Sequence, residues 1–243
     1  MSTRQIKISF LIILSALIFP IYSWSPDTSQ LFWNRDIIIE FGYGYSYVNM
    51  GNINKYYLED FGKKMGLFDK TLHFTPFLSP EFGLVFTNNI ISLSYQYSNT
   101  VLNGKTLQDM VGNSLQSNLY VSLWTINGSF RRLLTIKPFL IGLGASLSIG
   151  KGSAYLGSEF EYETAKQEDL LSEGLGGGGS IFGEIDYIVL KRILLECRIS
   201  MNILLTETLK DNYYGKWIVD DNGHEINLDY SGVSSSLRIG FLW

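Results

Sequence analysis

Seven charged residues have a spacing that could support chemistry, because each alternates with apolar residues in an extended segment. They are Glu40, Glu81, Glu184, Asp186, Glu196, Arg198 and Arg238. In a strand, alternation places them on the face opposite the apolar residues. We expect a paired ion network, since a charge in a narrow interior is costly unless it is paired. The two other interpretations are the gate of a narrow polar pore and a set of catalytic carboxylates.

Histidine and cysteine chemistry has little support. The chain has two histidines, His73 and His224, in or beside long polar segments, and one cysteine, Cys197. A serine nucleophile needs a neighbouring base, and neither histidine lies in a His-x-Ser pattern. These three residues also make no metal site with ligand-like spacing. The sequence therefore predicts no cofactor, no metal and no enzymatic activity.

The elements that would position the seven charges are strands, because apolar residues recur at every second position. The alternation is clear in five segments and less regular in three. The clear ones lie near 37–47, 91–98, 139–149, 195–205 and 233–243, and the others near 81–86, 119–124 and 180–189. Pro76 and Pro80 interrupt the approach to the first irregular segment.

The connections between these segments alternate in length. Short turns are expected at 87–89, 131–135 and 190–192, and long polar loops at 49–72, 99–116, 151–175 and 206–229. Short turns on one side and long loops on the other are typical of outer-membrane barrels. We therefore predict an all-β fold, a transmembrane antiparallel up-and-down barrel of eight strands. The Asn222-Gly223 pair predicts a hairpin in the last loop, and an independent strand pair there would raise the count to ten.

Alternation alone does not distinguish this barrel from a soluble one with its apolar face inside. Aromatic residues favour the membrane barrel, because two aromatic girdles are expected where its wall meets the two interfaces of a bilayer. The long-loop girdle would be Tyr43, Tyr45, Tyr47, Tyr95 and Tyr97. The short-turn girdle would be Trp33, Phe86, Phe139, Tyr187 and Trp243.

The ends of the chain indicate export and assembly. Residues 1–23 have basic residues followed by a short apolar run, as in a signal peptide cleaved near Ser23 or Ser25. Residues 24–36 would form a periplasmic segment and 37–243 the barrel. At the C-terminus, the alternating residues Leu237, Ile239, Phe241 and Trp243 resemble the terminal β-signal of outer-membrane proteins, although Phe is the usual last residue.

With these features, the chain resembles the small eight-stranded barrels of the OmpX-like, OmpW-like and OmpA-transmembrane-like class. The resemblance implies a bacterial outer-membrane location, contact with outer-membrane lipids, and recognition of the C-terminal strand by the assembly machinery. It identifies no subfamily and no extracellular ligand. Some small outer-membrane barrels modify lipids, so a lipid-modifying enzyme remains the least favoured alternative.

Two of the expected loops have a composition of their own. In the first loop, apolar residues at helical spacing predict a short amphipathic helix that rests on the barrel mouth or on the outer leaflet, with a ligand-contacting lid and a disordered loop as alternatives. They are Ile53, Tyr57, Phe61, Met65 and Phe68. The third loop is acidic, which we interpret as a solvated face, with cation or basic-partner binding as the alternative. Its acids are Glu159, Glu161, Glu163, Glu168, Asp169 and Glu173.

The charge balance limits the partners further. Two of the 19 Lys and Arg residues and none of the 23 Asp and Glu residues lie in residues 1–23, which leaves 17 against 23 and a formal charge of −6. Nucleic acid is therefore not an expected partner, because phosphate binding needs a basic face. The favoured function is a non-enzymatic outer-membrane barrel whose surface loops serve adhesion, antigenic or structural roles. A narrow channel or a binder of small or hydrophobic molecules is the second interpretation.

Overall fold

A computed structural model describes nine stretches of the chain. They are residues 37–50, 53–54, 72–108, 114–136, 139–160, 163–189, 192–211, 215–219 and 223–243. The expected signal peptide, the periplasmic segment with Trp33, and most of the expected first-loop helix lie outside these residues. Of that helix only Ile53 and Asn54 are described, so the helix stays a prediction. Within the described residues no helix is long and apolar enough to cross a membrane.

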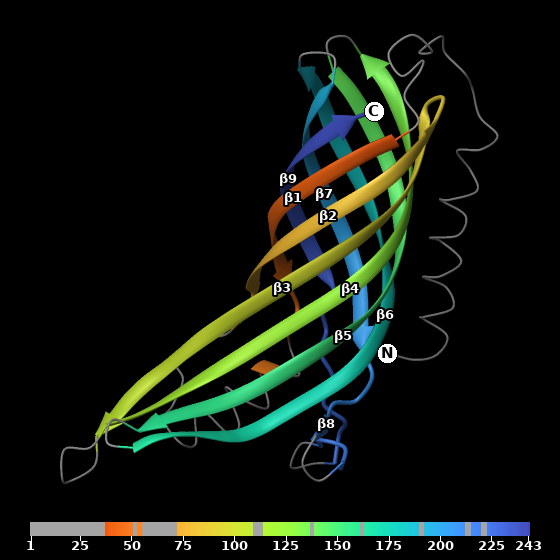
Figure 1. The fold of residues 1–243 in the computed structure, drawn as a ribbon. Helices are drawn as coiled ribbons and strands as arrows, with labels where there is room; N and C mark the ends of the chain where they lie inside the picture. The colour runs from red at the N-terminus through yellow and green to blue at the C-terminus, as the bar shows by residue number, and fades with distance from the viewer. Residues whose placement is uncertain are drawn as a thin grey trace.

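Eight long antiparallel strands close into a barrel (Figure 1). Each pairs with its neighbours in the order β5-β4-β3-β2-β1-β9-β7-β6, and the pairing of β5 with β6 closes the ring. The strands are β1 (Ile37–Val48), β2 (Phe74–Phe86), β3 (Asn89–Gln108), β4 (Ser114–Ile136), β5 (Phe139–Phe160), β6 (Glu163–Val189), β7 (Ile193–Thr206) and β9 (Gly232–Leu242). The predicted eight-stranded barrel is confirmed, and the described residues add no further strand pair to its wall.

The barrel wall follows the two-residue period of the sequence. In β1 the side chains of Phe41, Tyr43 and Tyr45 are exposed on the outside, whereas Glu40 and Ser46 are buried inside. Closure pairs every wall strand on both sides, so the backbone groups of the wall are satisfied within the sheet. The start of β1 and the end of β9 meet at one rim of the barrel, where the backbone N–H of Trp243 donates to the backbone oxygen of Ile37 at 3.0 Å. This is also the rim of the short turns (Figure 1).

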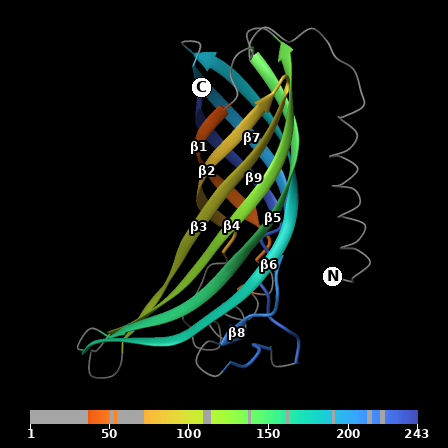
Figure 2. The same cartoon turned by 45° about the vertical axis from the view of Figure 1, so that its right-hand side comes forward.

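Two predicted loops are strands instead. The segments 99–116 and 151–175 belong largely to the β3–β4 and β5–β6 hairpins, which continue in antiparallel register beyond the barrel mouth. Figure 2 shows these four strands leaving the barrel together as a curved sheet. Their polar composition hid them, because the apolar alternation of a barrel wall fades where the wall ends. Four strands have 11 to 14 residues, and β3 to β6 have 20 to 27.

The expected turn at 131–135 is also wrong, because β4 continues to Ile136. Two adjacent arginines made the segment look like a polar connection, whereas Arg131 faces inward and Arg132 lies on the other face. Likewise, β2 runs through Pro76 and Pro80. Ser79 and Pro80 are skipped in the pairing of β2 with β3, which runs from Leu78 to Glu81 without them, as fits an imino acid without an N–H donor.

The last long connection forms a small structure of its own over the mouth. It contains β8 (Lys210–Asp211), which pairs with Ser172 and Glu173 of β6. An antiparallel bridge joins Val219 to Glu225, and the turn of the predicted hairpin at Asn222 lies outside the described residues. Gly223 has a φ of 79°, a conformation that glycine adopts without steric cost.

Candidate functional site

A layer of eight charged side chains fills the half of the lumen nearest the short turns. It contains the seven residues singled out in the sequence, together with Arg131, and draws on six of the eight barrel strands. The register of the strands sets them at one level, since Glu40 pairs with Glu81, and Glu196 pairs with both Asp186 and Arg238. We call these eight residues the charged layer.

Arg131 lies at the centre of the charged layer and is completely buried. Its Nη2 donates to Glu40 Oε1 at 2.7 Å, and its Nη1 donates to Glu196 Oε2 at 3.1 Å and to Glu184 Oε2 at 3.2 Å. One guanidinium thus joins carboxylates from three strands. Sequence reasoning missed it because the segment around it was interpreted as a turn. Continuing the two-residue period from Thr125 through Ser129 would have found it.

Arg238 and Arg198 hold the fourth glutamate. Both contact Glu81 Oε2, Arg238 through Nη2 at 2.7 Å and Arg198 through Nη1 at 3.1 Å. Arg198 Nε also donates to Glu184 Oε2 at 3.1 Å, and its guanidinium carbon lies 4.4 Å from the centre of the Phe182 ring. These contacts fix the arginine planes across the lumen.

Glycines leave room for these long side chains. A Cβ on Gly42 would lie 2.9 Å from Arg238 Nη1, and one on Gly142 would lie 2.4 Å from Glu184 Oε1. Inward glycines on the strands therefore have a packing role, because the interior of an eight-stranded barrel is only wide enough for side chains.

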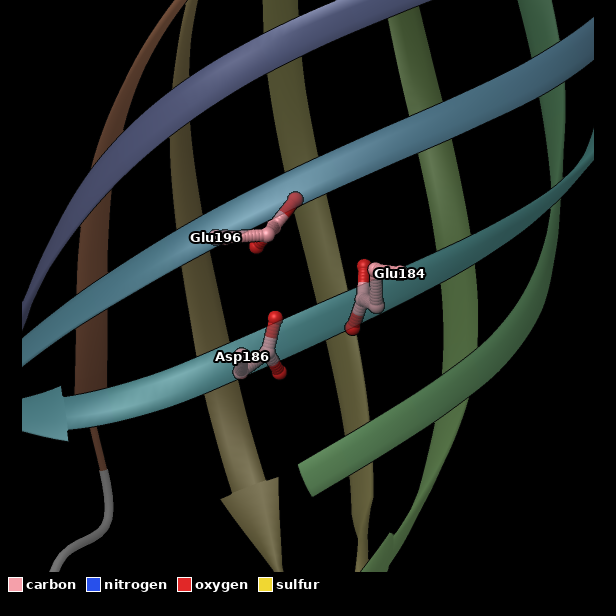
Figure 3. A group of neighbouring side chains, drawn as sticks. All are labelled: Glu184, Asp186 and Glu196. Atoms are coloured by element: carbon pink, nitrogen blue, oxygen red, sulfur yellow. The ribbon is translucent and has the colours of Figure 1, made fainter. Parts of the chain in front are cut away.

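Three carboxylates form a group within the charged layer. Glu184 and Asp186 lie two residues apart on β6, and Glu196 faces Asp186 from β7. Figure 3 shows the three side chains on the inner side of these two strands. One carboxylate oxygen of each lies within 4.8 Å of one oxygen of the others. Asp186 is fully buried and neither of its oxygens has a hydrogen-bond partner.

Apolar side chains close the lumen on the short-turn side of the charged layer. This inner apolar layer consists of Ile38, Val85, Ile90, Leu133, Leu140, Leu194 and Leu242. On the opposite side of the charged layer lie serine and asparagine side chains, for example Ser146, whose hydroxyl lies 2.8 Å from that of Ser180. Two cavities among them measure about 60 and about 40 Å³.

A second apolar cluster lies at the long-loop mouth, and we call it the outer apolar layer. It consists of Val48, Met50, Ile53, Leu72, Leu119, Val121, Leu123, Ala154, Leu156, Leu204, Leu209, Ile218, Ile226, Leu228 and Tyr230. Leu119, Val121 and Leu123 therefore point inward, whereas the sequence pattern favoured the lipid face for the apolar residues of a strand. The reason is that the last connection covers the mouth and gives apolar side chains a dry interior to fill.

The outer wall carries large exposed apolar side chains over all eight strands, from Leu93 on β3 to Ile199 on β7. The predicted long-loop girdle residues Tyr43, Tyr45, Tyr47, Tyr95 and Tyr97 are exposed there, as are Phe86, Phe139, Tyr187 and Trp243 of the other girdle. The C-terminal signal residues Leu237, Ile239 and Phe241 point outward on β9. Cys197 also lies on the outside.

The remaining sequence-predicted residues do not meet at a site. His73 stacks on Tyr47 with ring centres 5.4 Å apart, and His224 is exposed in the last connection. Of the acidic third segment, Glu173 pairs with Lys151 at 2.6 Å. The structure does not describe the side chains of the other five acids of this segment, which are Glu159, Glu161, Glu163, Glu168 and Asp169.

Comparison with known proteins identifies no family. No protein-family model and no curated protein matches the sequence. Three solved structures are similar in fold alone. Neisserial surface protein A (NspA) is 12% identical over 85% of this chain and 95% of its own, with a TM-score of 0.42. The attachment invasion locus protein Ail of Yersinia pestis, in complex with the heparin analogue sucrose octasulfate, is 11% identical over 86% and 99%, with a TM-score of 0.41. The outer membrane protein OprG from Pseudomonas aeruginosa is 14% identical over 86% and 96%, with a TM-score of 0.39.

Proposed function

We propose that the chain is a non-enzymatic integral protein of a bacterial outer membrane, and that it acts through the sheet that β3 to β6 extend beyond the barrel mouth. The observation that carries this proposal is the combination of a filled lumen with hairpins about twice as long as the wall needs. A tilted strand crosses a bilayer in about 9–11 residues, and β4 and β6 have 23 and 27.

The outer wall supports the membrane location. Side chains such as Leu143, Ile185 and Leu237 are 55 to 72% exposed. Exposed apolar area on this scale would be unfavourable in water, and soluble proteins rarely show such continuous patches. In the hydrocarbon of a bilayer the same exposed apolar side chains carry no free-energy penalty. The closed sheet also leaves no wall strand with an unpaired edge.

The filled lumen argues against transport as the main role. The described side chains form an apolar layer at each end of the lumen, and two cavities described between these layers have volumes of about 60 and about 40 Å³. Such cavities take a few water molecules each. The outer sheet is then the part that meets the surroundings. Its β3 edge has recorded partners on β2 only as far as Ser98, and an edge strand is a surface on which another chain can pair.

A shortened hairpin tests this role. Leu102 and Leu119 face each other across β3 and β4, so Asn-Gly in place of residues 103–118 would join them by a tight turn. Bacteria that express each form at equal level are compared for adhesion to immobilised laminin and fibronectin and for aggregation with one another. Heat-modifiable gel migration checks that the barrel is folded.

We expect the shortened form to fold and to lose the adhesion or aggregation of the parent. The matched control is Gly128→Ala, on the same strand but in the wall, where an added Cβ meets no atom within 4 Å. Equal adhesion by the parent and the shortened form, above that of cells without the protein, would contradict the proposal.

A further inference from the structure

The group of Glu184, Asp186 and Glu196 has more negative charge than its surroundings compensate. The charged layer has five carboxylates against three guanidiniums, so its formal charge is −2. Arg131 binds the Oε2 atoms of both glutamates. No arginine lies within ion-pair distance of Asp186 among the described contacts.

Several oxygens of this group lack a hydrogen-bond partner. Both oxygens of Asp186 and Oε1 of Glu184 are buried without a hydrogen-bond partner. Glu196 Oε1 also lacks one, although Arg198 Nε lies 2.7 Å and Arg238 Nε 3.2 Å from it, outside hydrogen-bond geometry. Buried polar atoms in proteins are nearly always satisfied. The three oxygens of Asp186 and Glu184, which have neither a hydrogen bond nor a described ion pair, therefore point to a ligand that accepts lone pairs (Figure 3).

The spacing of the group suits a metal ion. Its ligand oxygens lie within 4.8 Å of one another, and two oxygens that each lie about 2.4 Å from one calcium ion are separated by at most about 4.8 Å. The guanidinium of Arg131 contacts the Oε2 atoms, and Arg198 and Arg238 lie within ion-pair distance of Glu196 Oε1. Among the described ion pairs, Glu184 Oε1 and the two oxygens of Asp186 therefore have no arginine contact and are the main ligands offered to the ion, with Glu196 shared between the ion and the arginines. Carboxylate oxygens are the ligands that hard divalent cations take.

We propose that Glu184, Asp186 and Glu196 bind one divalent cation, with calcium as the preferred ion. The ion neutralises the excess charge of the charged layer and joins β6 to β7 through three side chains. Because an apolar layer lies at each end of the lumen, the ion enters while the barrel forms and is then retained as a structural element. This site is independent of the surface role of the outer sheet.

Refolding in defined metal tests the site. The full chain without its first 23 residues is refolded into detergent micelles in the presence of calcium, of magnesium or of a chelator. Free metal is removed by gel filtration, and bound metal is measured by mass spectrometry. We expect about one calcium ion per chain for the parent and background metal for Asp186→Asn, with Glu184→Gln as a second variant. The matched control is Glu207→Gln, an exposed carboxylate of the last connection, which should retain the ion.

Stability provides a second readout. For the parent, each ten-fold increase in calcium above the dissociation constant during refolding should raise the folding equilibrium constant about ten-fold. Asp186→Asn should show no calcium dependence, and in chelator it should be at least as stable as the parent because it removes an uncompensated buried charge. Parent protein that refolds in chelator without metal and gains no stability from calcium or magnesium would overturn the proposal. If Asp186→Asn fails to refold, the comparison of the parent with and without metal still decides it.

Discussion

Among the described ion pairs of the lumen Arg131 has the most, four, with Glu40, Glu184 and Glu196 at 3.2 Å or less and Glu81 at 3.8 Å. We expect Arg131→Ala to lower the free energy of unfolding by about 3–5 kcal/mol, since removing one partner of a buried ion pair leaves the other charges uncompensated. Urea unfolding in detergent, followed by tryptophan fluorescence, measures this loss. The matched control is Arg132→Ala, which lies next to it on the other face of β4 and should cost less than about 1 kcal/mol. Equal losses for the two variants would refute a central role for Arg131.

Tyr230 is a second residue whose contribution to stability can be measured, because that contribution depends on pH. It lies outside the barrel wall, before β9, where its side chain is buried in the outer apolar layer and its hydroxyl has no hydrogen-bond partner. Burial raises the pKa of this phenol above its ordinary value of 10.0. Its contribution to stability is therefore constant below pH 10 and falls as the pH rises above it, because the unfolded state loses the proton first.

We expect Tyr230→Phe to be more stable than the parent by about 1 kcal/mol at neutral pH, because a buried unsatisfied hydroxyl is removed. Above pH 10 this difference should widen. Chemical unfolding on both sides of pH 10 measures it, with Tyr97→Phe on the exposed wall as the control. A Tyr230→Phe protein that is less stable than the parent would show that the hydroxyl is satisfied.

At the residue scale the sequence predicts seven of the eight inward charges, because they alternate with apolar residues of a wall strand, and it misses Arg131, which has Arg132 beside it. The contacts among them could not be predicted, since they depend on register between strands far apart in sequence. Glu40 and Arg131, for example, meet over 91 residues. The convergence of Glu184, Asp186 and Glu196 has the same origin, because only the pairing of β6 with β7 places them together.

Among the elements, the glycine run at the start of the β6 wall has a testable asymmetry. A Cβ on Gly178 would lie 1.9 Å from Ile203 O on β7, whereas one on Gly177 would approach nothing closer than Ser148 O at 3.7 Å. We expect Gly178→Ala to separate β6 from β7 locally and to lower the free energy of unfolding by about 1–3 kcal/mol. Gly177→Ala is the matched control and should be close to neutral. Thermal unfolding of both proteins checks this, and similar melting temperatures would contradict the close approach.

The two-residue period of the sequence predicts that a strand is present, but it does not predict how long the strand is. The wall segments of β1 and β9 are visible because one face meets an apolar surrounding and the other a polar lumen. Beyond the mouth, in β3 from about Asn99 and in β6 before Gly176, that contrast ends and the segments look like loops. The inward apolar face of Leu119 and Val121 has a tertiary cause as well, because the distant 206–230 connection covers it.

Viewed as a whole, the molecule has four layers along its axis. From the short-turn rim these are the inner apolar layer, the charged layer, the serine and asparagine side chains, and the outer apolar layer. The wall sequence fixes the barrel, but the sealing of the lumen needs the charged layer and the covering connection together. With the lumen filled, the proposed function assigns contact with other molecules to the outer sheet.

That arrangement makes a prediction for the purified protein in a planar bilayer. Ion flow needs a continuous water-filled path, and two apolar layers with cavities of about 60 and about 40 Å³ between them interrupt any such path. We therefore expect no steady conductance steps, although insertion should be efficient.

A sixteen-stranded porin, whose wider barrel leaves an aqueous channel, serves as the positive control for the bilayer. Protease protection in liposomes verifies insertion of the silent protein. Steady steps of uniform size from folded protein would show that the layers open, and transport would then replace surface contact as the favoured function.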